Sequence, residues 1–173
     1  MPSRRQTLAL AAAALLAPGA ALAAAPPEAL RRTLMSAVRR AVPSTAELKH
    51  PVLILDLGRL GFAGIALFAD EDQTTFSGVT AMGPRAQIDT LPEVFEINGR
   101  FEMTVEAVLT VPDAAGSKAI VVLYSYYING TGQAEGHAGY LYRWGGNEWL
   151  IDERATGKLA GVRNAAQARA RLR

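Results

Sequence analysis

The sequence predicts an α+β domain: an N-terminal amphipathic helix, a mainly antiparallel twisted sheet of about six strands, and a short C-terminal helix. Three observations lead to this prediction. Apolar residues recur at helical spacing between Ala29 and Val42, apolar and polar residues alternate between Phe101 and Val111, and a segment rich in Ala and Arg follows Asn164. Helices are therefore expected at both ends of the domain, with strands between them.

Residues 1–23 are expected to be a cleaved signal peptide that precedes one domain, residues 24–173. The arginine pair Arg4 and Arg5 is followed by a short apolar run and by an Ala-Leu-Ala motif that ends at Ala23. These are the three parts of a secretory signal peptide. The arginine pair fits a bacterial twin-arginine signal and also an ordinary Sec signal, and both routes stay open. The mature protein is expected to be periplasmic or secreted.

The composition excludes several kinds of site. The 173 residues include no cysteine and only two histidines, His50 and His137. A disulfide, a thiolate nucleophile, a Cys-held iron–sulfur cluster and a zinc site of cysteines or of three histidines are therefore excluded. No cofactor is expected.

Charge is sorted along the chain. The full sequence has 18 basic and 16 acidic side chains, and loss of residues 1–23 removes two arginines and no acid, which makes the mature chain formally neutral. Residues 24–43 carry a net charge of +3, residues 44–153 carry −9 and residues 154–173 carry +6. The two ends of the domain are thus basic and its middle is acidic.

The first helix is expected between Ala29 and Val42. Proline in a first turn and an acid such as Glu28 both favour a helix start, and Pro43 ends the helix. One face is apolar, and most of the arginines fall outside it. The apolar residues are Leu30, Leu34, Ala37, Val38 and Ala41, and the arginines are Arg31, Arg32, Arg39 and Arg40.

The middle of the chain has the patterns of strands. Residues 52–57 and 61–69 are short apolar runs, whereas residues 44–51 are expected to be a connector and residues 79–92 a loop. The alternation in residues 101–111 is the strongest strand pattern. A three-residue loop at residues 97–99 would pair Phe95 with Phe101, and we prefer it to a two-residue Asn-Gly turn.

The last strands are expected to form a hairpin. Residues 119–128 are apolar on both faces, as in a central strand that is covered on each side. Residues 138–144 and 149–151 flank a Gly-Gly-Asn turn. The final helix is expected at residues 165–172, because Asn164 and Gln167 have the spacing of a capping box.

Aromatic residues suggest a recognition face. All five Tyr and both Trp lie between residues 124 and 149. Tyr and Trp join apolar area to a polar tip, which suits the binding of glycans or proteins. The predicted binding residues are Tyr126, Asn129, Tyr140, Tyr142 and Trp144. The alternative is that Arg143 marks the solvated face of this strand, so that the aromatic stripe belongs to the core.

Two weaker patterns are candidates for chemistry. Glu135, His137 and Tyr140 could act as an acid/base set, although a solvated loop histidine is the simpler interpretation. Oxygens at Asp70, Asp72 and Thr74 match the first alternate ligands of a calcium loop. That pattern then fails at its sixth and twelfth positions, so we interpret this segment as an acidic hairpin tip and predict no metal.

The basic ends could bind anionic partners. Arg31, Arg32, Arg39 and Arg40 could contact a membrane surface. Together with the C-terminal arginines they could also engage anionic lipid, nucleic acid or acidic polymers. The C-terminal arginines are Arg163, Arg169, Arg171 and Arg173. Neutral overall charge and export argue against nucleic acid. A simpler account is that both helices dock on or beside the acidic sheet domain, with complementary charge helping their placement.

The function predicted from the sequence is an exported binding or inhibitory module. It would act on a protein or a cell-envelope glycan, as a monomer or weak dimer, without catalysis of its own. The alternative is a small hydrolase or isomerase that uses Glu135 and His137 as acid/base groups.

Overall fold

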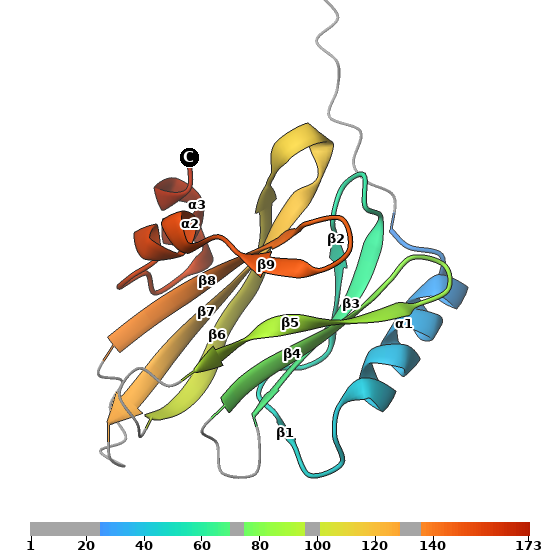
Figure 1. Cartoon of the computed structure of the whole chain (residues 1–173), viewed down its shortest axis with the longest axis horizontal. Helices are drawn as coiled ribbons and strands as arrows, with labels where there is room; N and C mark the ends of the chain where they lie inside the picture. The colour runs from blue at the N-terminus through green and yellow to red at the C-terminus, as the bar shows by residue number, and fades with distance from the viewer. Residues whose placement is uncertain (1–24, 70–74, 96–100, 129–135) are drawn as a thin grey trace, which may run out of the picture.

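The structure is a computed structural model that describes residues 25–69, 75–95, 101–128 and 136–173 (Figure 1). Four sequence predictions fall partly or wholly outside these residues. They are the signal peptide, the candidate metal ligands at residues 70–74, the loop at residues 97–99, and the site residues Asn129 and Glu135.

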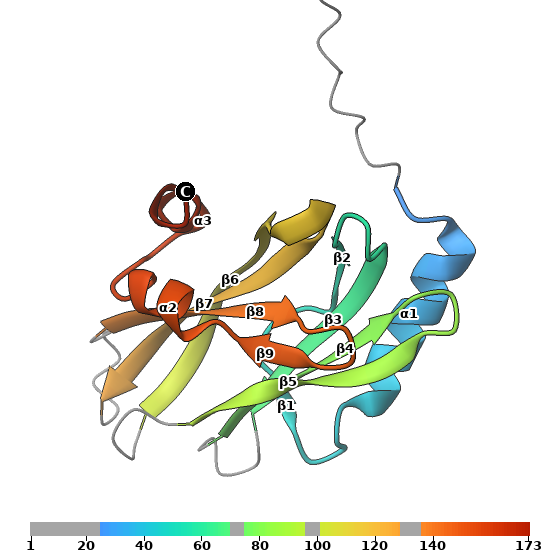
Figure 2. The same ribbon diagram turned by 45° about the horizontal axis from the view of Figure 1, so that its top comes forward.

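The described residues form two antiparallel sheets, which Figure 2 shows from a second direction. The first sheet contains β1 (Glu47–Leu48), β2 (Leu53–Asp56), β3 (Phe62–Ala69), β4 (Thr75–Met82) and β5 (Gln87–Phe95), with β1 and β2 both paired to β3. The second sheet has the order β6 (Phe101–Pro112), β7 (Lys118–Ile128), β8 (Gly136–Trp144) and β9 (Trp149–Ile151). The helices are α1 (Glu28–Ala41), the 3₁₀ turn η1 (Ala114–Gly116), α2 (Glu153–Lys158) and α3 (Ala165–Arg171).

The predicted α+β class and the helices near both ends are confirmed. The described part of the chain holds nine strands in two sheets, however, where the sequence predicted one sheet of about six. None of the helices in this part is long and apolar enough to cross a membrane.

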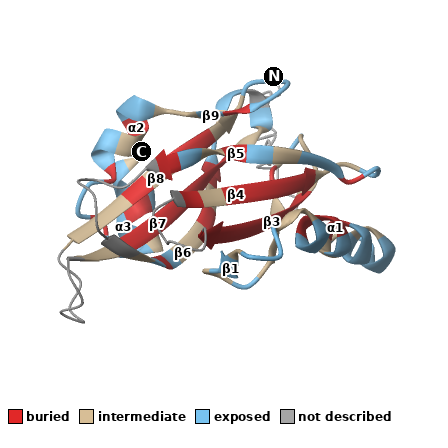
Figure 3. Cartoon of the chain, turned by 60° about the horizontal axis from the view of Figure 1, so that its bottom comes forward, coloured by how far each residue is buried: buried red, intermediate tan, exposed pale blue. Residues whose placement is uncertain are grey.

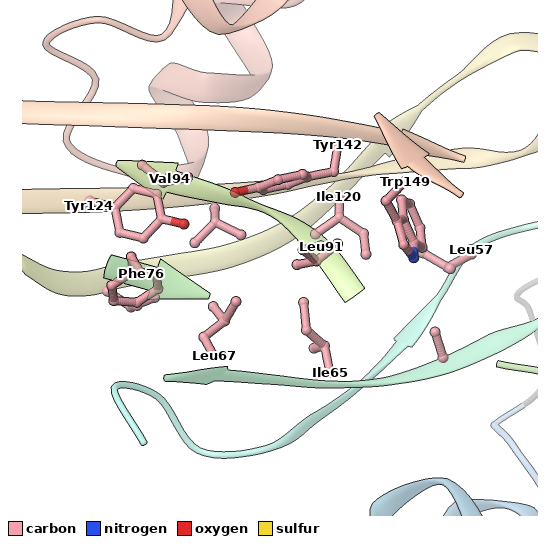
Figure 4. Close-up of a cluster of buried hydrophobic side chains, with 13 residues drawn as sticks. Leu57, Ile65, Leu67, Phe76, Leu91, Val94, Ile120, Tyr124, Tyr142 and Trp149 are labelled. Atoms are coloured by element: carbon pink, nitrogen blue, oxygen red, sulfur yellow. The ribbon is translucent and has the colours of Figure 1, made fainter. Parts of the chain in front are cut away.

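The main core lies between the two sheets (Figure 4). Ile65, Leu67 and Phe76 come from the first sheet, and Ile120 and Tyr124 come from the second. All five are at most 2% exposed. Burial of this apolar surface is the main stabilising term of the fold.

The outer face of the first sheet is covered by α1. Leu34 and Val38 are fully buried against the strands. A Cβ on Gly64 of β3 would lie 3.2 Å from the backbone oxygen of Leu34 and from Cγ1 of Val38, so helix and strand are in close contact. The exposed side of the helix carries its arginines (Figure 3).

The outer face of the second sheet is covered by α2 and α3. Leu159, Val162 and Ala168 pack on Val121 and Leu141 of the central strands. The prediction that residues 119–128 form a strand covered on both faces is therefore confirmed. Figure 1 shows α1 and the α2–α3 pair on opposite sides of the molecule.

The two sheets also meet at one edge. The turn after β2 forms a bridge between Gly58 and Ser117, and the Nζ of Lys118 lies 2.5 Å from Oδ2 of Asp56. Gly58 has a φ of +66°, and a Cβ there would lie 2.3 Å from the backbone oxygen of Gly116. This contact requires glycine for both reasons.

Three local predictions are wrong. Residues 79–92 are not a loop, because β4 and β5 pair from Thr75 with Phe95 to Met82 with Gln87. Residues 44–51 contain the short strand β1. Phe95 does not pair with Phe101: β5 and β6 belong to different sheets, and Phe101 pairs with Ile128.

Two other local predictions are confirmed. The last hairpin pairs Trp144 with Trp149. The side chain of Asn164 accepts a hydrogen bond from the backbone N–H of Gln167 at 3.0 Å and thereby caps α3. Helix α2 was not predicted, and it begins after Asp152, whose carboxylate accepts from the N–H of Ala155 at 2.8 Å.

Candidate functional site

The aromatic stripe of β8 faces the core. Tyr142 is 2% exposed, which leaves it no surface for a partner, so the core interpretation holds for this residue. Tyr140 and Trp144 are half-buried and pack against the same core. Tyr126 is also half-buried, near the end of β7.

The polar groups of the core aromatics either form hydrogen bonds inside the protein or remain protonated near neutral pH. The indole N–H of Trp149 donates to Oγ1 of Thr80 at 2.9 Å. Burial raises the pKa of the phenols of Tyr124, Tyr140 and Tyr142. A phenol with a raised pKa is a poor base near neutral pH. Figure 4 shows Tyr124 and Tyr142 between the two sheets.

His137 and Tyr140 do not share a face of β8. His137 pairs with Ser125 of β7 on the face toward α2 and α3, whereas Tyr140 packs into the core. Residues three apart on a strand point to opposite sides. The strand therefore separates two members of the proposed acid/base set, and the third, Glu135, lies outside the described residues.

The structure brings two unpredicted polar residues near His137. Ser125 is fully buried and donates a hydrogen bond to Oε1 of Glu106 at 2.5 Å. Within the described ranges, Nδ1 of His137 is buried and has no hydrogen-bond partner. Because the proton of Ser125 is directed to a carboxylate, the hydroxyl is not set up for deprotonation by His137. These residues come together only through the strand register. The one signal in the sequence is a polar Ser within an apolar run, so the sequence did not predict them.

The strands on either side of the acidic segment pair as a hairpin tip at residues 70–74 requires. Strands β3 and β4 pair up to Ala69 with Phe76, on either side of residues 70–74. Among the residues that the structure describes, no group of three or more His, Asp or Glu side chains could hold a metal ion.

A basic pocket lies where α2 and α3 meet the ends of β6 and β8. It consists of two adjoining hollows of about 380 and 360 Å³ that share Val111, Pro112 and Leu172. The first, the polar half, is also lined by Leu141, Arg143, Asp152, Arg154, Ala155 and Lys158. The second, the apolar half, is completed by Arg169 and Arg173. We refer to the two hollows together as the C-terminal pocket.

Arg143 is fixed at the floor of the polar half. Its Nε donates to Oδ2 of Asp152 at 2.7 Å, and its Nη1 pairs with Oδ1 of Asp113. The backbone N–H of Ala155 and the guanidinium of Arg143 hold the pKa of Asp152 below its usual range. Asp152 is therefore ionised near neutral pH, and its carboxylate and that of Asp113 both pair with Arg143.

The other cations of the C-terminal pocket are not neutralised. Arg154, Lys158, Arg169 and Arg173 are exposed and form no ion pair with any described residue. Four cations are thus available around a cavity with a partly apolar lining. A third hollow, beside the end of α1, contrasts with this pocket because its one charged lining residue is Glu93.

Charge does not hold the basic helices on the sheets. Helix α1 contacts its sheet through Leu34, Ala37 and Val38, and the described ion pairs include none between a helix cation and a strand carboxylate. The expected docking of both helices on the sheets is confirmed, and none of the described ion pairs joins α1 or α3 to a strand. Apolar burial holds them, and the described interactions of the cations of α1 stay within that helix, from Arg32 to Glu28 and from Arg40 to Ser36.

Comparisons of the chain with protein-family models, with curated proteins and with solved structures gave no match.

Proposed function

We propose that the mature protein is an exported binding module that recognises a negatively charged protein or cell-envelope glycan, without catalysis of its own. One observation carries the proposal: four exposed cations without ion-pair partners in the described structure line the C-terminal pocket.

Unpaired cations around a cavity favour an anionic ligand for two reasons. They attract it over a distance of about a Debye length, and they form charge-assisted hydrogen bonds on contact. The pocket is also built on rigid elements. Arg143 connects β8 to Asp113, which precedes η1, and to Asp152, the cap of α2. Arg143 thus holds the start of α2, the helix that carries Arg154 and Lys158, in place before a ligand binds, and this lowers the entropy cost of binding.

The test compares two variants that lose the same charge. The pocket variant is Arg154→Gln/Lys158→Gln/Arg169→Gln/Arg173→Gln, and the helix variant is Arg31→Gln/Arg32→Gln/Arg39→Gln/Arg40→Gln. The probes are poly-glutamate and oligogalacturonate, titrated calorimetrically at low and high salt.

We expect at least one probe to bind at low salt and to weaken at high salt. The pocket variant should lose about tenfold or more in affinity, while the helix variant stays within about threefold of the wild type. Equal losses of affinity in both variants would show that net charge alone drives binding and would refute the proposal. The absence of binding of either probe at low salt would also refute it.

A further inference from the structure

The two halves of the C-terminal pocket differ in chemistry, and the difference bears on its ligand. The polar half contains Arg154 and Lys158 beside the Arg143–Asp152 pair. Three of the five residues that line the apolar half are aliphatic, namely Val111, Pro112 and Leu172, and they lie beside Arg169 and Arg173. A complementary ligand therefore needs an apolar group next to anionic groups.

We propose that the C-terminal pocket binds an acidic peptide segment of a partner protein that carries an aliphatic side chain between acidic residues. The aliphatic side chain occupies the apolar half, against Pro112 and Leu172. Acidic side chains on either side of it contact Arg154 and Lys158 in one direction and Arg169 and Arg173 in the other. This inference rests on the proposed function and selects the protein over the glycan as partner.

The aliphatic lining favours a peptide for a physical reason. Leu172 is half-buried, so part of its side chain is open to a ligand. Filling such a seat with an aliphatic side chain removes apolar surface from water on both partners. A sugar ring would instead place hydroxyl groups against Pro112 and Leu172, where those groups would lose hydrogen bonds with water. Among the described residues, neither hollow is lined by an aromatic side chain that could pack on a sugar ring.

The cations also fit an extended segment. Arg154 and Lys158 line one hollow, Arg169 and Arg173 line the other, and the shared residues Val111, Pro112 and Leu172 lie between. One compact anion would contact one pair of cations only. A segment with acids on both sides of an apolar residue contacts both pairs.

The experiment uses two synthetic peptides with identical acidic positions. One has leucine at the central position and the other has serine, and oligogalacturonate is the third probe. Affinities for the wild type, the pocket variant and Leu172→Ala are measured by fluorescence anisotropy, with circular dichroism as a check of folding.

We expect the leucine peptide to bind the wild type about tenfold more tightly than the serine peptide. Leu172→Ala should reduce this preference to about threefold or less, because it removes part of the seat and no charge. The pocket variant should weaken both peptides.

Other outcomes separate this inference from the proposed function. If both peptides bind equally, or if oligogalacturonate binds more tightly than the leucine peptide, the peptide inference is overturned and an anionic partner is still supported. If no probe binds the wild type at low salt, both proposals fail. The helix variant is the control, and a loss there equal to that of the pocket variant would also overturn the inference.

Discussion

Trp149 in β9 donates its indole N–H to the hydroxyl of Thr80 in β4, at 2.9 Å, across the space between the two sheets. Both residues are buried, at 2% and 0% exposure. The same hydroxyl lies 3.3 Å from the backbone oxygen of Asp89, to which it donates. The sheets are thus joined in the core by a polar contact as well as by apolar packing.

Loss of this contact is expected to destabilise the fold. Thr80→Val keeps the shape of the side chain and leaves a buried indole N–H unpaired, which should cost about 1–3 kcal/mol. Thr80→Ser keeps the acceptor and should cost about 1 kcal/mol for its missing methyl group. Urea unfolding measures both values, and a valine variant as stable as the wild type would contradict the role of the hydrogen bond.

The close packing of α2 on the second sheet can be tested by replacing each of two glycines with alanine. A Cβ on Gly139 would lie 2.7 Å from Cδ2 of Leu123 and 3.0 Å from Cβ of Leu159, so Gly139→Ala should destabilise the protein by about 1–3 kcal/mol. Gly157 in α2 has open space around its Cβ position, and Gly157→Ala should be neutral or stabilising by up to about 1 kcal/mol. Thermal unfolding compares the two. Equal effects would argue against close packing at Gly139.

Asp152 should make stability depend on acid pH. Its pKa is lower in the folded protein because it accepts from the N–H of Ala155 and pairs with Arg143. Such a carboxylate stabilises the fold above its unfolded pKa of about 4, and this contribution is lost as the pH falls through the lower, folded pKa. Asp152→Asn should therefore be less stable near neutral pH and lose less stability on acidification.

Urea unfolding at a series of pH values checks this expectation. Glu148→Gln, on the exposed turn of the last hairpin, is the control and should keep the pH profile of the wild type. If the profile of Asp152→Asn also matched the wild type, the contribution of Asp152 would be disproved.

His137 separates the binding account from the enzymatic alternative. It lies six residues before Arg143 on β8, roughly 20 Å along an extended strand. His137→Ala should therefore leave the affinity for poly-glutamate within about twofold of the wild type, because no step of binding uses the imidazole. A loss comparable to that of the pocket variant would instead place the site near His137 and Ser125.

The fold could be predicted from the sequence where its signals are local. Helix α1 follows from the apolar spacing and from Pro43, and the last hairpin follows from its Gly-Gly-Asn turn. The division into two sheets could not be predicted, because it depends on long-range contacts such as the bridge between Gly58 and Ser117. β5 was missed because Pro92 lies within it and its exposed residues include Ile88 and Thr90, which blur the alternation.

Of the candidate site, only the excess of positive charge near the C-terminus could be predicted from the sequence. The excess of six cations after residue 153 is visible in the sequence. The apolar lining of the C-terminal pocket could not be predicted, because Val111 and Pro112 end a strand more than forty residues earlier in the chain. The aromatic residues had the composition of a recognition face, but the same composition fits a core between two sheets, and the structure buries Tyr142 and Trp149.

Mapping the bound surface tests the central claim most directly. Amide chemical shifts of the isotope-labelled protein are followed by NMR during a titration with poly-glutamate at low salt. We predict that the largest shifts occur at the residues that line the C-terminal pocket and carry an amide proton. These are Val111, Leu141, Arg143, Asp152, Arg154, Ala155, Lys158, Arg169, Leu172 and Arg173. Shifts concentrated on α1, or spread evenly over all exposed cations, would contradict it.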